Sequence, residues 1–240
     1  MGVYLIRIAV LVDDRPYMEG LKTRRGLSIY VEINNNFLLF DLGPDSGILQ
    51  YNSDKLDISL DLIDAAIISH AHSDHMGGLQ LLGWVAPFLK TFIPYDSMDS
   101  VGRIVKNNGL TPVEVIDWVK LWENTYITKP IHGPPWEHFL VINTSKGIIV
   151  FSGCMHAGVD KVLKIISMYL GGRIRGVIGG FHLENAPRKV VEASVKLLIE
   201  KYGVDFVIPL HCSGELFRRI LRNNYSDKYI NAGAGFIYEL

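Results

Sequence analysis

A dense group of metal-binding residue types follows a short apolar segment early in the chain. Residues 65–69 are apolar and partly β-branched, which predicts a strand buried on both faces. Four ligand-type residues lie within the next six positions: His70, His72, Asp74 and His75. Imidazole and carboxylate ligands suit Zn, Fe, Mn or Ni better than Ca or Mg. The spacing therefore predicts a transition-metal site at the tip of a buried strand.

Length, charge and composition limit the class of protein. The chain has 240 residues, of which 48% are hydrophobic and 20% charged, so a soluble globular protein with a large core is expected. A formal net charge of −1 argues against a nucleic-acid-binding protein. The first twelve residues include Arg7 and run into two aspartates, so they predict a first strand rather than a signal peptide. No apolar run is long enough to cross a bilayer, and we expect a cytoplasmic protein with no membrane partner.

The pattern of apolar residues and turn residues predicts an α/β fold. No linker or low-complexity tract divides the sequence, so we expect one domain over residues 1–240. Strands are predicted at residues 4–12, 28–33, 37–41, 65–69, 91–93, 112–116, 122–128, 139–143, 147–151, 176–178, 205–209 and 230–239. Helices are predicted at residues 47–55, 78–84, 97–107, 159–169, 187–202 and 214–223. Two strand-rich halves, each followed by helices, favour two packed sheets covered by helices, a four-layer αββα sandwich.

Three further histidines lie at predicted strand ends. His156, His182 and His211 each follow a buried apolar segment and precede a helical one, so ligand or catalytic roles are expected for them. His132 and His138 lie in a loop beside Gly-Pro-Pro-Trp and are expected at the surface or rim.

The chain has two cysteines, and each lies within two residues of a histidine. A structural disulfide is not expected in a reducing compartment. Cys154 is either a ligand or a small buried hydrophobic residue, whereas Cys212 fits the buried hydrophobic role better.

These motifs resemble those of the metallo-β-lactamase superfamily over nearly the whole chain. The hallmark is the His-x-His-x-Asp-His motif at residues 70–75, and Asp41 matches the aspartate of the upstream strand that supports the ligand loop. More narrowly, the chain resembles the dihydropterin-synthase-like branch, whose namesake is an archaeal enzyme of methanopterin synthesis. The segments that carry this likeness are residues 10–14, 26–28, 153–158, 179–183 and 211–214.

Two positions depart from the superfamily pattern. Most members have an aspartate that bridges two metals after the strand matching residues 147–151, and this chain has Ser152-Gly153-Cys154 there. Their additional upstream histidine has only His132 as a rough counterpart. The resemblance then implies that His156 replaces it as a ligand and that a binuclear site is less certain than in the hydrolases.

The resemblance implies one or two divalent transition metals, with zinc expected and manganese or iron as alternatives. A metal-bound hydroxide would form at neutral pH, Asp74 would orient the water, and His182 would donate a proton or hold an anionic oxygen. Asp41 would orient an imidazole from behind the ligand loop. The ligands implied are His70, His72 and His156 for one metal and Asp74, His75 and His211 for the other, with Cys154 as an additional candidate.

Three functional hypotheses follow. The first is a hydrolase acting on a phosphorylated small molecule. The second is a transferase that condenses a dihydropterin-methyl diphosphate with a ribofuranosyl-aminobenzene phosphate, as in methanopterin synthesis. The third is a non-enzymatic metal-binding or sensor protein. The substrate and the oligomeric state are left open by the sequence.

Overall fold

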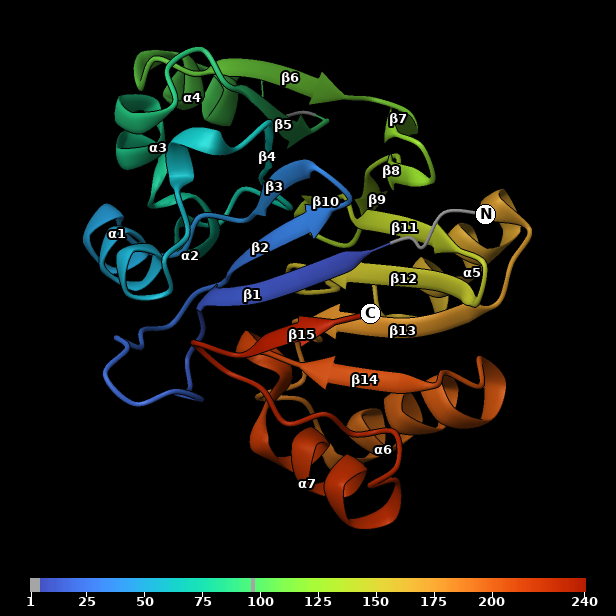
Figure 1. Cartoon of the computed structure of the whole chain (residues 1–240). Helices are drawn as coiled ribbons and strands as arrows, with labels where there is room; N and C mark the ends of the chain where they lie inside the picture. The colour runs from blue at the N-terminus through green and yellow to red at the C-terminus, as the bar shows by residue number, and fades with distance from the viewer. Residues whose placement is uncertain (1–4, 96–97) are drawn as a thin grey trace. The chain divides into compact units, whose positions relative to one another are not determined.

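The computed structural model describes residues 5–95 and 98–240, and the chain divides into two compact units. Unit 1 comprises Met1–Ile116 and Ala232–Leu240, and unit 2 comprises Asp117–Asn231. Each unit is built on its own main sheet (Figure 1). The single domain expected over residues 1–240 stays a prediction. None of the helices in the described part of the chain is long and apolar enough to cross a membrane.

Unit 1 contains a seven-stranded sheet in the order β15-β1-β2-β3-β4-β5-β6. The strands β15, β1, β2 and β3 pair antiparallel, whereas β3 to β6 pair parallel. Because the carboxyl ends of parallel strands share one edge of a sheet, the segments that follow β3 and β4 lie at the same edge. The strands are β1 (Ile6–Val12), β2 (Ser28–Ile33), β3 (Asn36–Phe40), β4 (Ala65–Ile67), β5 (Lys90–Pro94), β6 (Thr111–Val115) and β15 (Ile237–Glu239).

The helices of unit 1 pack apolar side chains onto this sheet. Ile48 and Leu49 of α1 join a buried cluster with Leu39 of β3 and Ala66 of β4. The Asp45 side chain caps α1 by accepting a hydrogen bond from the backbone N–H of Ile48. The helical segments are α1 (Ser46–Lys55), η1 (Leu60–Leu62), α2 (Ser73–Met76), α3 (Leu79–Val85), η2 (Met98–Gly102) and α4 (Arg103–Asn107).

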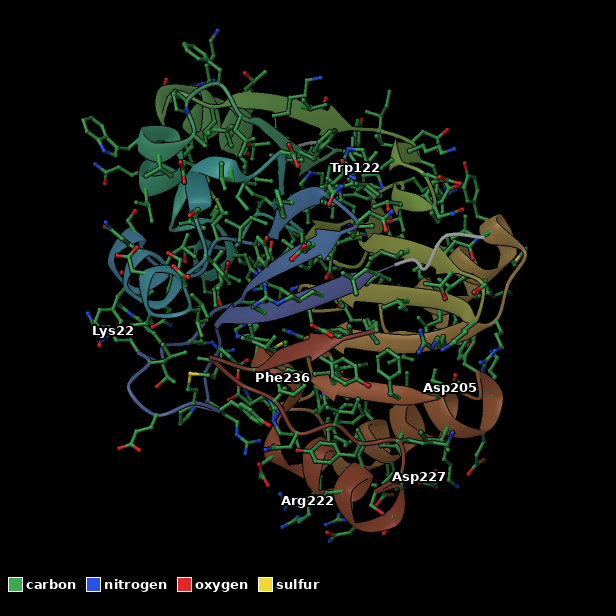
Figure 2. All side chains as sticks on the ribbon, viewed as in Figure 1. Lys22, Trp122, Asp205, Arg222, Asp227 and Phe236 are labelled. Carbon is green, nitrogen blue, oxygen red and sulfur yellow. The ribbon has the colours of Figure 1, made fainter. Side chains whose placement is uncertain are left out.

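The C-terminal segment of unit 1 extends the sheet beside the first strand. β15 pairs with β1 in the register Arg7↔Glu239. Phe236, labelled in Figure 2, lies just before β15 and contacts Tyr17 edge to face with 5.0 Å between the ring centroids. This aromatic contact joins the C-terminal segment to the loop that follows β1.

Unit 2 contains a six-stranded sheet in the order β14-β13-β12-β11-β8-β7 and a two-stranded sheet of β9 and β10. The strands β12, β13 and β14 pair in parallel, so their carboxyl ends meet at one edge. The strands are β7 (Val119–Trp122), β8 (Thr125–Ile127), β9 (Ile131–His132), β10 (Trp136–Glu137), β11 (Leu140–Thr144), β12 (Gly147–Ser152), β13 (Ile174–Gly179) and β14 (Phe206–Pro209).

Amphipathic helices connect the parallel strands of unit 2. In the first of them, Val162, Leu163 and Ile166 are buried in the unit's apolar cluster, and Gly171 in the left-handed region ends the helix. The helical segments are α5 (Val159–Leu170), α6 (Arg188–Lys196), η3 (Leu197–Lys201), η4 (His211–Ser213) and α7 (Glu215–Asn224). Each unit therefore has its own buried cluster of apolar side chains.

Several predicted elements differ from the structure. The strand predicted at residues 122–128 is interrupted because Asn124 adopts a left-handed conformation and turns the chain between β7 and β8. The helices predicted at residues 97–107 and 187–202 each combine an α-helix with a π-helical segment, and Ser97 lies outside the described residues. The strand predicted at residues 230–239 is limited to β15.

Candidate metal centre

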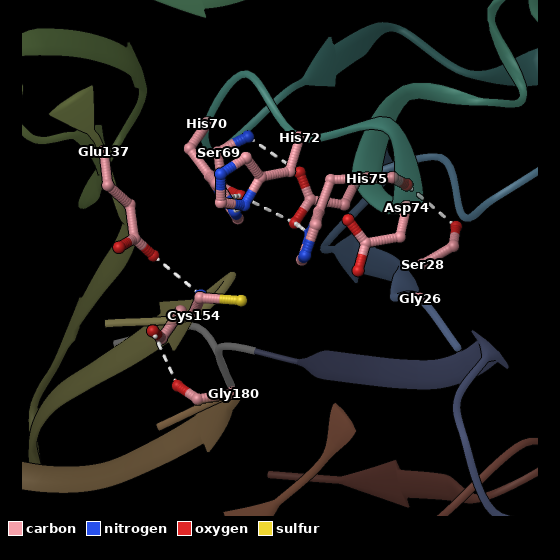
Figure 3. A network of polar contacts seen from close by, with 12 residues as sticks. Gly26, Ser28, Ser69, His70, His72, Asp74, His75, Glu137, Cys154 and Gly180 are labelled. Atoms are coloured by element: carbon pink, nitrogen blue, oxygen red, sulfur yellow. Dashed lines mark hydrogen bonds and ion pairs between the residues drawn. The ribbon is translucent and has the colours of Figure 1, made fainter. Parts of the chain in front are cut away.

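Unit 1 gathers the histidines of the predicted motif around a short turn after β4. His70 follows the strand, and α2 carries Asp74 and His75. His70 and His75 are buried, whereas His72 is exposed. His70 Nε2 and His72 Nδ1 are 2.9 Å apart, and the rings of His70 and His75 have centroids 4.2 Å apart (Figure 3). The structure therefore brings these three imidazoles together at the sheet edge.

Asp41 supports this group from within the core of unit 1. Its buried carboxylate accepts hydrogen bonds from the Ser69 backbone N–H at 2.7 Å and the Ser69 hydroxyl at 2.8 Å. His75 Nδ1 donates to the same carboxylate at 2.7 Å. His70 Nδ1 donates to Ser69 Oγ at 2.9 Å, because that hydroxyl already uses its proton toward Asp41. This network assigns the protons of His70 and His75 to Nδ1 and leaves the lone pairs on both Nε2 atoms.

A close backbone approach fixes the segment that carries Asp74. Leu27 N donates to Asp74 O at 3.2 Å, and a Cβ on Gly26 would lie only 2.5 Å from that oxygen. A glycine is therefore required beside α2, and the next residue upstream, Arg25, has its Nε 4.0 Å from the Asp74 carboxylate. The Asp74 side chain is partly exposed, so its carboxylate remains accessible to solvent.

Unit 2 gathers a second group at the ends of its three parallel strands. Cys154 and His156 follow β12, His182 follows β13, and His211 and Cys212 form part of η4 after β14. The ligand atoms of Cys154, His156 and His182 lie within 4.8 Å of one another, and so do those of Cys154, His211 and Cys212. His182 and His211 adopt positive φ angles, a strained conformation that costs on the order of 1 kcal/mol and is frequent at functional sites.

A buried glutamate that the sequence did not indicate supports this second group. Glu137, on β10, accepts hydrogen bonds from the backbone N–H groups of Cys154, Met155 and His156 at 2.8, 2.9 and 2.8 Å, and Figure 3 shows the contact with Cys154. Complete burial raises the pKa of Glu137 to about 7, although the three hydrogen bonds oppose that increase. No sequence motif surrounds Glu137, so its contacts with the loop after β12 become visible only in the folded structure.

The neighbouring histidines were only partly predicted. His132 is exposed at the rim, as expected. The expected surface position of His138 is wrong, because this residue is fully buried beside the β11 strand that begins at Leu140. Residues 137–140 are all buried, although the turn residues before them suggested an exposed loop.

The two cysteines of unit 2 are free, buried and in contact. Their sulfur atoms are 3.2 Å apart, and the backbone N–H of His182 donates to Cys212 Sγ at 3.2 Å. The hydrogen bond with Cys154 holds the pKa of the Cys212 thiol well below its usual range. Ser152, in the segment that stands in place of the expected bridging aspartate, donates to the Gly180 carbonyl at 3.0 Å. The segment after β12 therefore offers sulfur and imidazole rather than a carboxylate.

The donor atoms fit divalent transition metals in both groups. In unit 1, two nitrogens bound tetrahedrally to one ion at about 2.0–2.1 Å stand about 3.3 Å apart, a few tenths of an ångström more than the 2.9 Å between His70 Nε2 and His72 Nδ1. In unit 2, imidazole and thiol donors converge from three strand ends. Carboxylates that hold the ligands in place, Asp41 in unit 1 and Glu137 in unit 2, are typical of metal sites.

Comparison with known proteins agrees with this chemistry. The family model for the metallo-β-lactamase superfamily matches residues 21–166. A 7,8-dihydropterin-6-methyl-4-(β-D-ribofuranosyl)-aminobenzene-5′-phosphate synthase from Methanocaldococcus jannaschii is 25% identical, covering 97% of this chain and 96% of its own.

Solved structures show the same fold. The crystal structure of Tm1679, a metal-dependent hydrolase of the β-lactamase superfamily, has a TM-score of 0.84 and 26% identity over 98% of this chain and 99% of its own. The metallo-β-lactamase fold protein YhfI from Bacillus subtilis has a TM-score of 0.73 and 14% identity over 99% of this chain and 100% of its own. The predicted α/β fold of the metallo-β-lactamase type is confirmed by these likenesses. The chain belongs to the metallo-β-lactamase superfamily.

Proposed function

We propose that this protein is a metal-dependent enzyme that acts on a phosphorylated small molecule, with hydrolysis as its main reaction. The observation that carries the proposal is the hydrogen-bond network from Asp41 through Ser69 and His75. This network holds the Nδ1 atoms of both buried imidazoles and leaves their Nε2 lone pairs for another partner, as in a histidine that binds metal.

The residues that would hold metal come from both groups described above. In unit 1 they are His70, His72, Asp74 and His75, and in unit 2 they are His156 and His211. The assignment of His156 to the ion of His70 and His72, and of His211 to the ion of Asp74 and His75, stays a prediction from the family resemblance. Zinc is the expected metal, with manganese and iron as alternatives.

A bound divalent metal supplies a Lewis acid for phosphoryl oxygens and lowers the pKa of water to about 7. The side chains of this protein would do the remaining work. The partly exposed carboxylate of Asp74 orients the attacking water and accepts its proton. The exposed imidazole of His182 donates a proton to the leaving oxygen or binds an anionic oxygen of the substrate. Both roles are proposals from residue chemistry.

A second candidate is the condensation of a dihydropterin-methyl diphosphate with a ribofuranosyl-aminobenzene phosphate. The synthase from Methanocaldococcus jannaschii favours it, because its 25% identity extends over 97% of this chain. Both reactions need positive charge facing phosphate oxygens, so the same residues serve either one. The two differ in whether water or an aromatic amine attacks.

The test begins with the full-length protein stripped of metal by a chelator. Zinc, manganese or ferrous iron is then added, and turnover is measured with bis(p-nitrophenyl) phosphate and p-nitrophenyl phosphate. The condensation of the two pterin-pathway substrates is assayed in parallel. We expect turnover in one assay that requires metal and is absent from the His72→Ala variant. Stoichiometric metal binding without turnover in any assay would instead indicate a non-enzymatic metal-binding protein.

A further inference from the structure

We propose that Cys154 and Cys212 both ligate the metal in unit 2, so that this part of the centre binds a thiophilic divalent ion through two sulfur atoms. The inference rests on the proposed function in assuming that the protein binds metal, and it places His211 with the two cysteines instead of with Asp74 and His75. It adds Cys212 to the ligands and sets the chemistry of unit 2 apart from the imidazole and carboxylate chemistry of unit 1.

The topology of unit 2 brings the two sulfur atoms together. Cys154 follows β12 and Cys212 follows β14, on either side of β13 in the same parallel sheet. Their Sγ atoms are 3.2 Å apart although the residues are separated by 58 positions. Two thiolates bound tetrahedrally at about 2.3 Å from one zinc ion stand about 3.8 Å apart. A shift of a few tenths of an ångström in each side chain therefore suffices to admit an ion.

Fixed contacts hold each cysteine in this position. The Glu137 carboxylate accepts the Cys154 backbone N–H at 2.8 Å, while the His182 backbone N–H donates to Cys212 Sγ at 3.2 Å. A Cβ on Gly180 would lie 2.8 Å from Cys212 Sγ and 2.1 Å from the Gly153 carbonyl oxygen. Only glycine therefore leaves room for the sulfur at this place.

A backbone hydrogen-bond donor faces the Cys212 sulfur. The backbone N–H of His182 donates to Cys212 Sγ at 3.2 Å, and the Cys212 thiol lies 3.2 Å from Cys154 Sγ. A neutral thiol is a weak acceptor, whereas backbone N–H groups commonly stabilise metal-bound thiolates. Both side chains are nearly fully buried, so solvent does not supply this stabilisation.

His211 completes a donor set of one nitrogen and two sulfurs. Its ligand atom and those of Cys154 and Cys212 lie within 4.8 Å of one another, and all three residues are buried. Metal binding replaces the two thiol protons, which are released to solvent as the two metal–sulfur bonds form. Such a set favours zinc, cobalt or ferrous iron over magnesium or manganese.

The direct test is X-ray absorption at the zinc edge on the full-length, zinc-loaded protein. We expect sulfur scatterers at about 2.3 Å together with nitrogen or oxygen scatterers at about 2.0–2.1 Å. A zinc-loaded protein that shows nitrogen and oxygen scatterers alone would overturn the inference while leaving the proposed function intact. Absence of any bound metal would instead contradict both.

Cobalt substitution tests the two cysteines separately. We expect a near-ultraviolet sulfur-to-cobalt charge-transfer band that falls by about half in Cys154→Ser and in Cys212→Ser and vanishes in the double variant. His132→Ala is the matched control, because this exposed histidine belongs to neither ligand group, and it should keep the full band. A full band in either serine variant would remove that cysteine from the ligands. A thiol count of zero in the denatured metal-free protein would reveal a disulfide and also overturn the inference.

Discussion

The two ligand groups differ in how the chain assembles them. In unit 1 the proposed ligands lie within residues 70–75, on one turn and a short helix. In unit 2 the corresponding side chains range from Cys154 to Cys212, and they meet only because three strands pair in parallel. A local group depends on turn geometry, whereas a dispersed group depends on the whole sheet. The second is therefore expected to be more sensitive to changes in the surrounding core.

Each group also has one buried carboxylate behind it, and the two carboxylates act on different targets. Asp41 binds the His75 ring and the Ser69 hydroxyl, so it orients side chains. Glu137 binds three successive backbone N–H groups, so it orients the main chain that carries Cys154 and His156. The following predictions test this difference.

The largest effect is expected from the ligands of unit 1. His72→Ala and Asp74→Ala should each lower metal-dependent turnover about 1000-fold or more, because the reaction depends on the bound metal. Both variants should remain folded, since the core of unit 1 is apolar and excludes these residues. Turnover, elemental analysis and circular dichroism provide the measurements. Unfolding of both variants would indicate a structural metal instead.

His182 is expected to act on substrate rather than on metal. His182→Ala should keep its metal by elemental analysis and lose about 100-fold in turnover, the usual size of a general acid contribution. His182→Asn is the matched control for the backbone, because asparagine tolerates the positive φ at this position better than alanine. Equal losses of turnover in both variants would assign the effect to the imidazole. Loss of metal from either variant would make His182 a ligand.

Asp41→Asn should reduce turnover or metal affinity about 10-fold to 100-fold, as is usual for residues that orient metal ligands. The amide keeps the size and the tolerance of positive φ, but it replaces one carboxylate acceptor by a donor that faces His75 and Ser69. Metal titration and turnover assays compare the metal affinity and the activity of the variant with those of the unchanged protein. An unchanged metal affinity and turnover would show that the network does not orient the ligands.

Glu137→Gln should destabilise the protein by about 1–3 kcal/mol, because one of three buried backbone N–H groups loses its acceptor. The effect on metal should be confined to unit 2, so the sulfur-to-cobalt band should weaken while metal bound by the unit 1 histidines persists. Chemical denaturation and the cobalt spectrum measure these effects. A variant that loses all its metal without loss of stability would contradict the different roles of the two carboxylates.

The smallest effect on stability and turnover is expected from the surface ion pair of Arg173 and Asp205 in unit 2, which serves as a control. Asp205 accepts two hydrogen bonds from Arg173 at 2.8 Å, and these hold the pKa of Asp205 below its usual range (Figure 2). The ion pair stabilises the folded protein at pH values above the pKa that Asp205 has in the unfolded chain. This stabilisation is lost as the pH falls through the lower pKa of Asp205 in the folded protein. Asp205→Asn should cost less than about 1 kcal/mol at neutral pH and leave metal and turnover unchanged. A loss of bound metal or of turnover in Asp205→Asn would show that this edge of unit 2 is coupled to the proposed ligands.

The sequence predicted the unit 1 group well because its information is local. The apolar strand, the histidine spacing and the glycines lie within fourteen positions, from residue 65 to residue 78, so periodicity and turn chemistry were sufficient. The family resemblance added Asp41, and the structure places this carboxylate against His75. Most longer strands and helices were also predicted, with errors at element ends and at Asn124, whereas short elements such as α2, β9 and β10 were missed.

The unit 2 group was predicted only in outline because its contacts are distant in sequence. Strand ends indicated His156, His182 and His211, but no local pattern reveals which of them share a neighbourhood. Glu137 lies in a two-residue strand, and its three partners are between 17 and 19 positions away. The buried contact between Cys154 and Cys212 depends on the pairing of β12, β13 and β14. Topology, rather than residue type, decides these contacts.

The most direct test of the account is a crystal structure of the metal-loaded protein with anomalous scattering recorded at the edge of the bound metal. The account predicts anomalous peaks within about 2.0–2.4 Å of histidine nitrogens of the 70–75 motif and of the side chains after β12 and β14. A fully metallated protein whose anomalous peaks lie away from both groups would contradict the assignment of these residues as the metal centre.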